Sequence, residues 1–352
     1  MKKMLLFEIR RNLLALVVFC VAAVAVSVVS VLTSELSYHF IEPESIDLRN
    51  AGIGTFTAIL CILCSVVPVM QFSYRMKMNS ADLYYSLPVG RVNLMFARVL
   101  VGLFLVFVPY TLAYWLGVAC VAMREPHFAF LWHLVYFVVS VPLGVGLFGV
   151  IAFLFTRGNT VLDGIAFAAL WSCLLPLIAM FLVPRVYVGG DPALPEYLHY
   201  YSYAQYAPMF FDYSPLAYTA GVFNSLACRD MLSTLSCQAL PIVLPLGVAE
   251  GIAAYVGLFV RADRDKAENA GQISSSWFGY RVLNPLYIAL LFAAVGKVMG
   301  GDVVMCVIVA VVGAALYFLY RRSFRLRKED VISYVLAVVI GIAALMLIHF
   351  LA

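Results

Sequence analysis

Glu250 is the side chain that could most clearly take part in chemistry or binding, because it is an acid inside an apolar stretch that reads PLGVAEGIAAYVGLF. An ionisable residue inside a membrane-spanning helix is costly and is a functional candidate by default. Glu250 could lie on a substrate path or bind a cationic group, or it could be protonated and hydrogen-bonded between helices. Gly247 and Gly251, four residues apart, permit close helix packing, which slightly favours the second interpretation.

The eight cysteines do not have the spacing of a metal site. Cys61 and Cys64 form a C-x-x-C in an apolar segment without a second pair, so we interpret them as small core residues. Cys228 and Cys237 fall in a segment that we predict to lie outside the membrane, where a disulfide could form in an oxidising compartment. We predict that this disulfide would join two short outer helices.

No metal centre or catalytic group is predicted. The five histidines are dispersed over the part of the chain predicted to lie in the outer half, and no nucleophile has a base at a recognisable spacing. The chain also lacks the G-x-x-x-x-G-K-[ST] sequence that binds ATP phosphates. We therefore predict a protein that is not an enzyme by itself.

The polar stretch from Tyr74 to Arg98 reads YRMKMNSADLYYSLPVGRVNLMFAR and lies between two long apolar runs. Its middle part begins at Ser80, a residue type favoured at helix starts, and ends at Pro88 and Gly90, so it predicts a short amphipathic helix. A simple turn needs only a few polar residues. A basic, half-apolar loop of this length instead indicates a docking surface.

The elements that position these residues follow from the composition. The chain of 352 residues is 64% hydrophobic and 12% charged, whereas soluble domains are about half apolar and a quarter charged. Since a spanning helix needs about 20 apolar residues, we predict an all-α polytopic membrane protein with about nine transmembrane helices. The predicted spans are 13–32, 53–72, 94–122, 131–155, 163–183, 240–260, 283–299, 303–320 and 331–351.

The first residues, 1–12, are too polar to span and predict an amphipathic helix in the membrane interface. A cleaved signal peptide is the alternative, but the following apolar run is longer than a signal core and no small-residue cleavage site is evident at its end. Of the 23 lysines and arginines, eighteen fall on one side when the N-terminus is placed inside. The positive-inside rule therefore predicts a cytoplasmic N-terminus, and the same asymmetry explains the net charge of +4 without any nucleic acid. We expect the chain to lie in the plasma membrane.

The order of these features resembles the permease subunit of a bacterial ABC transporter of the type-2 exporter class. An interfacial helix precedes the first span, and a loop at 73–93 carries DLYYSLPVGR, which is similar to an SLP-x-x-R loop of such permeases. An outer insertion at 184–239, rich in Tyr and Pro, separates the fifth and sixth spans. After the sixth span, RADRDKAENAG is similar to an R-x-x-E-x-A-G segment of a bacterial subgroup.

The resemblance implies a six-helix core over residues 1–281 and a mechanism. A separate cytoplasmic ABC ATPase would bind ATP and Mg²⁺, and two permeases, either identical copies or paralogues, would form a dimer in the lipid. The short amphipathic helix would be the coupling helix that enters a groove on the ATPase, as amphipathic helices do elsewhere. Its candidate contact residues are Asp82, Leu83, Tyr84, Tyr85, Leu87, Pro88 and Arg91.

Residues 282–352 depart from this class, because they add three apolar helices to the core. The segment before them also has two interpretations. Arg264, Glu268 and Gly271 could form a second ATPase contact or a hinge, or the segment could be a charged helix end capped by Gly271.

Two other function classes remain as alternatives. A membrane enzyme or scaffold could use the basic loops for topology or lipid contact alone. An ion-coupled transporter would need several acids inside the spans, and only Glu250 clearly qualifies in the sequence, which disfavours this class. For the exporter, the apolar bundle and aromatic outer segment suit an amphipathic substrate such as a peptide, a lipid or an antibiotic.

Overall fold

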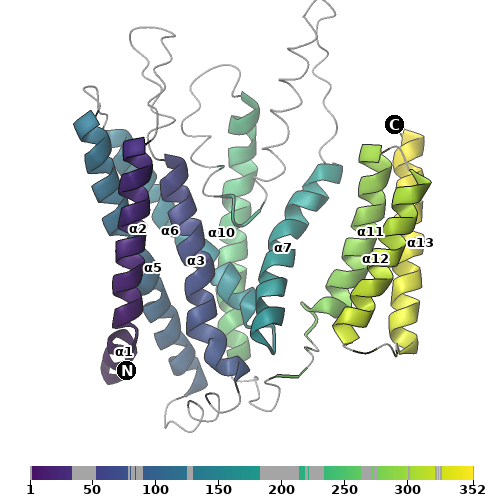
Figure 1. Cartoon of the computed structure of the whole chain (residues 1–352), viewed down its shortest axis with the longest axis horizontal. Coiled ribbons are helices and arrows are strands. Elements are labelled where there is room, and N and C mark those ends of the chain that lie inside the picture. The colour runs from purple at the N-terminus through teal and green to yellow at the C-terminus, as the bar shows by residue number, and fades with distance from the viewer. Residues whose placement is uncertain are drawn as a thin grey trace, which may run out of the picture.

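The chain folds into a row of helices that run roughly side by side, as the computed structural model shows (Figure 1). The structure describes residues 2–33, 53–77, 80, 84, 90–124, 130–182, 214–218, 221, 234–262, 271–272, 274, 276–299, 302–321, 323, 325 and 327–351. Within these ranges the regular elements are helical, which confirms the predicted all-α class.

The helix bounds agree closely with the predicted spans. The elements are α1 (Lys2–Arg11), α2 (Leu13–Thr33), α3 (Ile53–Phe72), the 3₁₀ turn η2 (Ser73–Met76), α5 (Arg91–Arg124), α6 (Phe130–Phe155), α7 (Val161–Leu182), α10 (Thr234–Ala262), α11 (Tyr280–Met299), α12 (Val303–Arg321) and α13 (Lys328–Leu351). Most helices extend a few residues beyond their apolar run, because backbone hydrogen bonding continues into the polar residues that flank it.

The largest difference is at α10, which begins at Thr234 and not at Leu240. Hydropathy marks the start of the apolar run, whereas the helix already includes polar residues before it. Cys237, predicted to lie in the outer insertion, is therefore part of α10. The start of α5 at Arg91 likewise shortens the predicted loop at 73–93.

Seven helices of the described chain are long and apolar enough to cross a membrane: α2, α3, α5, α6, α7, α10 and α13. Two shorter apolar helices occur in α11 and α12, where we predicted further spans. The membrane class is thus supported, and the number of nine spans stays a prediction. With 34 residues and a rise of about 1.5 Å per residue, α5 is about 50 Å long. That exceeds the roughly 30 Å hydrocarbon layer, so α5 must tilt or project beyond it.

One end of the bundle gathers the segments that we predict to be cytoplasmic. Helix α1, the start of α5, the turn between α6 and α7 and the turn between α12 and α13 all lie at the lower end in Figure 1, and the C-terminal end of α13 lies at the upper end. This alternation agrees with the predicted topology of the basic segments.

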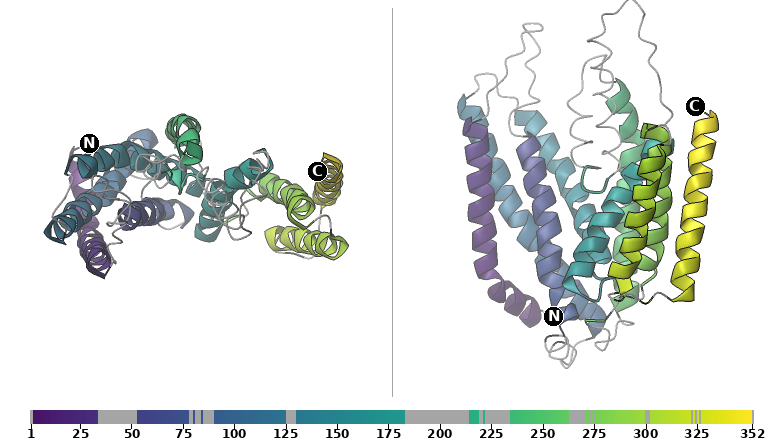
Figure 2. Two further views of the ribbon diagram at one scale, coloured as in Figure 1. Left: turned by 90° about the horizontal axis from the view of Figure 1, so that it is seen from above. Right: turned by 45° about the vertical axis from the view of Figure 1, so that its right-hand side comes forward.

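Helices α1 to α10 share a large cluster of buried apolar side chains, and α11 to α13 contain a separate small one around Ile288, Phe292, Tyr317 and Ala337. Viewed from above, α11, α12 and α13 form a group at the end of the row, next to α7 (Figure 2). The tyrosine hydroxyls of Tyr280 and Tyr287 connect this group to α7, by donating to Asp163 and to the carbonyl of Leu170.

The turn between α12 and α13 is held by an ion pair of Arg321 and Asp330. The carboxylate accepts from Nε and Nη2 of Arg321 at 2.6 and 2.8 Å, and it also accepts the backbone N–H of Arg327 at 3.2 Å. Both side chains are largely shielded from solvent. The pair therefore joins the end of α12 to the start of α13 across the turn.

We predict that Asp330→Asn lowers the free energy of unfolding by about 1–2 kcal/mol, as charge-assisted hydrogen bonds of this kind contribute. Thermal unfolding of the detergent-solubilised protein measures the change. Glu329→Gln is the matched control, since Glu329 is exposed and lies 3.9 Å from the exposed Arg281, a pair worth little. Equal midpoints for the two variants would contradict the prediction.

Candidate functional site

Arg98 is the centre of a polar cluster at the lower end of the bundle. It lies in the second turn of α5, and it is 1% exposed. Its guanidinium is 3.1 Å from a carboxylate oxygen of Glu8. It also donates to the backbone carbonyl of Gln71 at 3.1 Å and to the side-chain oxygen of Gln71 at 3.4 Å. One side chain thus joins α5 to α1 and to the end of α3.

Glu8 is the partner that brings α1 into this cluster. It is as completely buried as Arg98 and forms a second ion pair, at 3.0 Å, with Arg11 one turn later in α1. Burying two charges is tolerated only when they are paired and hydrogen-bonded. The polar inner edge of α1 is therefore fixed to α5, while Leu6 and Phe7 remain exposed, as expected for an interfacial helix.

Two tyrosine rings complete the cluster. The guanidinium carbon of Arg98 lies 4.5 Å from the ring centroids of both Tyr74 and Tyr84. The two rings meet edge to face, with centroids 4.8 Å apart, and Arg11 lies 5.5 Å from the Tyr84 ring. A cation near an aromatic face is attracted more strongly when both are shielded from water.

This arrangement fastens the segment between α3 and α5 to three helices. Tyr74 belongs to η2, directly after α3, and Tyr84 lies in the predicted coupling segment. Tyr84 thereby contacts side chains that belong to α1, to α5 and to the turn after α3.

The predicted coupling residues are placed only in part. Asp82, Leu83, Tyr85, Leu87 and Pro88 lie outside the described residues. Tyr84 is helical and partly buried, with its ring on Tyr74 and Arg98, and Arg91 is the first residue of α5. Their predicted ATPase contacts stay predictions.

Sequence reasoning missed Glu8, Gln71 and the role of Tyr74. A signal for Glu8 was present, because it is the first acid in the chain and the next is Glu35. A lone acid on an otherwise basic interfacial helix needs a cationic partner once it is buried. The sequence alone, however, could not choose Arg98 among the nearby basic residues.

A second group of contacts lies beside the turn between α6 and α7. The N–H of Gly271 donates to the carbonyl of Asn159 at 2.9 Å, and the hydroxyl of Ser274 donates to the carbonyl of Arg157 at 2.9 Å. The indole of Trp171 in α7 donates to the carbonyl of Phe278 at 2.8 Å. The segment from 271 to 278 is thus attached to the α6–α7 hairpin.

Gly271 has a φ of +80°, which glycine adopts without strain. A positive φ is common at the residue that follows a helix end. Arg264 and Glu268 lie outside the described residues, so neither interpretation of this segment is tested. The bond to Asn159 adds that Gly271 is fixed to the α6–α7 turn.

Glu250 lies near the middle of α10 and accepts a hydrogen bond of 3.1 Å from the hydroxyl of Tyr218. Tyr218 belongs to a short turn at 214–218, in which the carbonyl of Leu216 also accepts from the thiol of Cys61 in α3 at 3.0 Å. This part of the outer insertion therefore reaches into the bundle between α3 and α10. Among the described residues, no lysine or arginine forms an ion pair with Glu250.

The glycines beside Glu250 pack as predicted. A Cβ on Gly251 would lie 2.9 Å from the Cα of Gly146 in α6, and one on Gly247 would lie 2.8 Å from the ring of Tyr218. Helices α6 and α10 thus approach closely where both lack side chains.

The remaining sequence candidates are cysteines. Cys64 is fully buried and its thiol donates to the carbonyl of Gly144 at 3.4 Å, which agrees with a core role. The predicted disulfide of Cys228 and Cys237 is not tested, because Cys228 and the side chain of Cys237 lie outside what the structure describes. Within the described part of the chain, no three His, Cys, Asp or Glu residues are grouped as a metal site.

The chain matches no protein-family model, no curated protein and no solved structure.

Proposed function

We propose that this chain is the transmembrane permease subunit of an ATP-binding cassette exporter, driven by a separate cytoplasmic ATPase. In this proposal the ATPase binds ATP and Mg²⁺, and a second permease, identical or paralogous, completes a dimer in the plasma membrane. The segment from Ser80 to Pro88 contacts the ATPase. Substrates are amphipathic molecules that enter the bundle from the membrane or the cytoplasm.

The observation that carries this proposal is the complete burial of Arg98 between Glu8, Gln71 and the rings of Tyr74 and Tyr84. A loop that only reverses the chain direction does not need an anchor that requires the desolvation of a buried arginine and a buried glutamate. A segment that must transmit force needs a stiff connection to the helices that it moves. Arg98 supplies that connection to α1, α3 and α5 together.

The second attachment, at Gly271 and Ser274, supports the same proposal. It fixes the segment after α10 to the turn between α6 and α7, on the end of the bundle that carries Arg98 (Figure 1). Two surfaces on one end would let the closure of paired ATPases act on both halves of the helix row. Groups of packed helices would then rotate as rigid bodies relative to one another, since packed cores change between discrete arrangements.

The direct test is co-purification from native membranes. We predict that the wild-type chain retains an ATPase in mild detergent, and that Leu83→Ser with Leu87→Ser reduces the retained ATPase at least about tenfold, which corresponds to about 1.4 kcal/mol of binding. Quantitative mass spectrometry of the purified complex measures the ratio of the two chains.

Met123→Ser is the control for this test, since Met123 is an exposed apolar residue at the opposite end of α5. It should leave the ratio unchanged. A wild-type chain that carries no ATPase, or a double variant that carries as much as the wild type, would refute the coupling role.

A further inference from the structure

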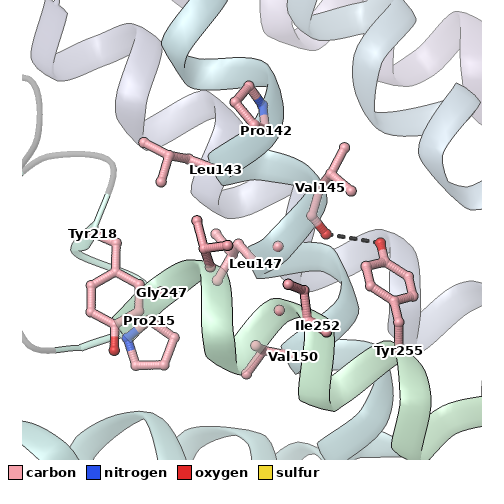
Figure 3. A pocket seen from close by; sticks show the side chains of 13 residues that line it. Pro142, Leu143, Val145, Leu147, Val150, Pro215, Tyr218, Gly247, Ile252 and Tyr255 are labelled. Atoms are coloured by element: carbon pink, nitrogen blue, oxygen red, sulfur yellow. Dashed lines mark hydrogen bonds between the residues drawn. The ribbon is translucent and has the colours of Figure 1, made fainter. Parts of the chain in front are cut away.

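A cavity of about 180 Å³ lies between α6, α10 and the turn at 214–218. Figure 3 shows Leu147 and Val150 of α6 facing Ile252 of α10 across it, with Pro215 and Tyr218 at one side. The hydroxyl of Tyr255 is bonded to the carbonyl of Val145 at 2.8 Å, so this polar atom is already satisfied. The cavity wall is therefore almost wholly apolar.

The volume limits what the cavity can hold. An apolar cavity of about 150 Å³ stays dry and accommodates a molecule the size of benzene, whereas complete drug-sized ligands need pockets of about 300–1,000 Å³. The cavity thus fits one alkyl chain end or one ring. The remainder of a larger ligand must stay outside it.

The cavity is also accessible from the surface of the chain. Val248 and Ile252 line it and are 49% and 61% exposed. Both lie near the middle of α10, so in a spanning helix the opening would lie at the level of the lipid hydrocarbon chains. An apolar group could enter sideways from the bilayer.

Glu250 does not line this cavity, but a lining residue reaches it. Tyr218 lines the cavity, and its hydroxyl reaches Glu250 at 3.1 Å. That hydrogen bond offsets part of the cost of burying Glu250, and no lysine or arginine of the described chain forms an ion pair with it. The ionised form of a carboxyl group is costly at this depth without a cation beside it, and a cationic ligand would stabilise that form.

We infer that this site binds an amphipathic amine, with its alkyl or aromatic group in the cavity and its ammonium group at Glu250. The inference names the substrate class of the exporter and, as a substrate site, rests on the proposed function. The binding itself does not need the ATPase. The amine belongs either to a soluble lipophilic compound or to the head group of an amine-bearing lipid.

The test uses octylamine with a diazirine at its chain end, and octanol with the same diazirine as the neutral counterpart. The full chain in phosphatidylcholine nanodiscs is illuminated with each probe, and labelled peptides are mapped by mass spectrometry. The amine should label residues 142–150 and 247–255. Glu250→Gln should lower amine labelling about tenfold, because it removes a charge-assisted interaction, and should leave alcohol labelling unchanged.

Two further variants separate the apolar and the charged parts of the site. Val248→Trp, at an exposed lining position, should obstruct the cavity and reduce labelling by both probes. Tyr218→Phe removes the hydroxyl but keeps the ring, so amine labelling should persist or rise. Equal labelling by amine and alcohol, or amine labelling that Glu250→Gln does not change, would overturn the inference.

Nanodiscs that contain phosphatidylethanolamine distinguish the two sources. If this lipid suppresses amine labelling, the site takes an amine-bearing lipid; if it does not, the site takes a soluble amine, and both results retain the amine chemistry. Co-purification of the ATPase with Glu250→Gln separates this inference from the proposed function. A retained ATPase without amine-specific labelling rejects the amine site alone, and labelling without any ATPase rejects the exporter alone.

Discussion

Replacing Arg98 with methionine is expected to lower the free energy of unfolding by about 3 kcal/mol, because it leaves the buried carboxylate of Glu8 without its main partner. The remaining ion pair with Arg11 keeps the loss near the lower end of the range for broken buried pairs. The variant also removes the cation from the rings of Tyr74 and Tyr84. Thermal unfolding in detergent, followed by the fraction of monodisperse protein, measures the change.

The double variant Glu8→Gln with Arg98→Met should recover most of that loss. Removing both charges eliminates the desolvation of an unpaired carboxylate, and matched neutral side chains often replace a buried pair at little cost. Arg98→Lys should fall between the wild type and Arg98→Met, since lysine keeps the charge but lacks the planar group that contacts both rings and Gln71.

Arg10→Met is the matched control, because it removes one positive charge from an exposed position of α1. Its free energy of unfolding should stay within about 0.5 kcal/mol of the wild type, as for ordinary surface substitutions. If Arg98→Met unfolds at the same temperature as Arg10→Met, then the cluster does not hold α1 to α5.

The positions of the helices could be predicted from the sequence because each helix is marked by a continuous apolar run within its own segment. Long apolar runs place α3 at Ile53–Phe72, as predicted, and most other helices within about three residues. Five described helices each contain one internal proline, at positions 68, 109, 142, 176 and 285. Proline in a spanning helix is tolerated because neighbouring groups satisfy the freed carbonyls. The prediction of helices that continue through these prolines was therefore correct.

The candidate sites were less predictable because their partners are distant in sequence. Glu8 and Arg98 are ninety residues apart, and nothing local in either segment identifies the other. Tyr218 was one of many tyrosines in the outer insertion, and its bond to Glu250 depends on how that insertion folds back. The glycine spacing around Glu250, in contrast, is a pattern within one helix and predicted close packing correctly.

The two sites lie at different depths of the same helix row. Arg98 and Glu8 belong to the start of α5 and to α1, which lie at the lower end in Figure 1, near the predicted ATPase surface, and Glu250 lies near the middle of α10. Helix α6 relates them, since it packs on α5 through Phe148 against Gly102 and on α10 through Gly146 against Gly251. In the proposed exporter, a displacement of α5 by the ATPase would therefore reach the cavity through α6.

Replacing Gly251 with alanine is the second change with a large expected effect. The added Cβ would lie 2.9 Å from the Cα of Gly146, and a backbone atom within a helix cannot rotate away as a side chain can. Helices α6 and α10 must separate, which forfeits the close contact that small residues provide in membranes. We expect the free energy of unfolding to fall by about 1–3 kcal/mol, as for other overpacked sites.

Two other glycines make this prediction specific. A Cβ on Gly54 in α3 meets nothing within 4 Å, so Gly54→Ala should be neutral or stabilise by up to about 1 kcal/mol through its better helix propensity. Gly247→Ala meets the ring of Tyr218, a side chain that can shift, and should cost less than Gly251→Ala while altering octylamine labelling. Because the same chemical change should destabilise the protein at Gly251 but not at Gly54, an equal loss in both variants would show that backbone contact with Gly146 is not the cause.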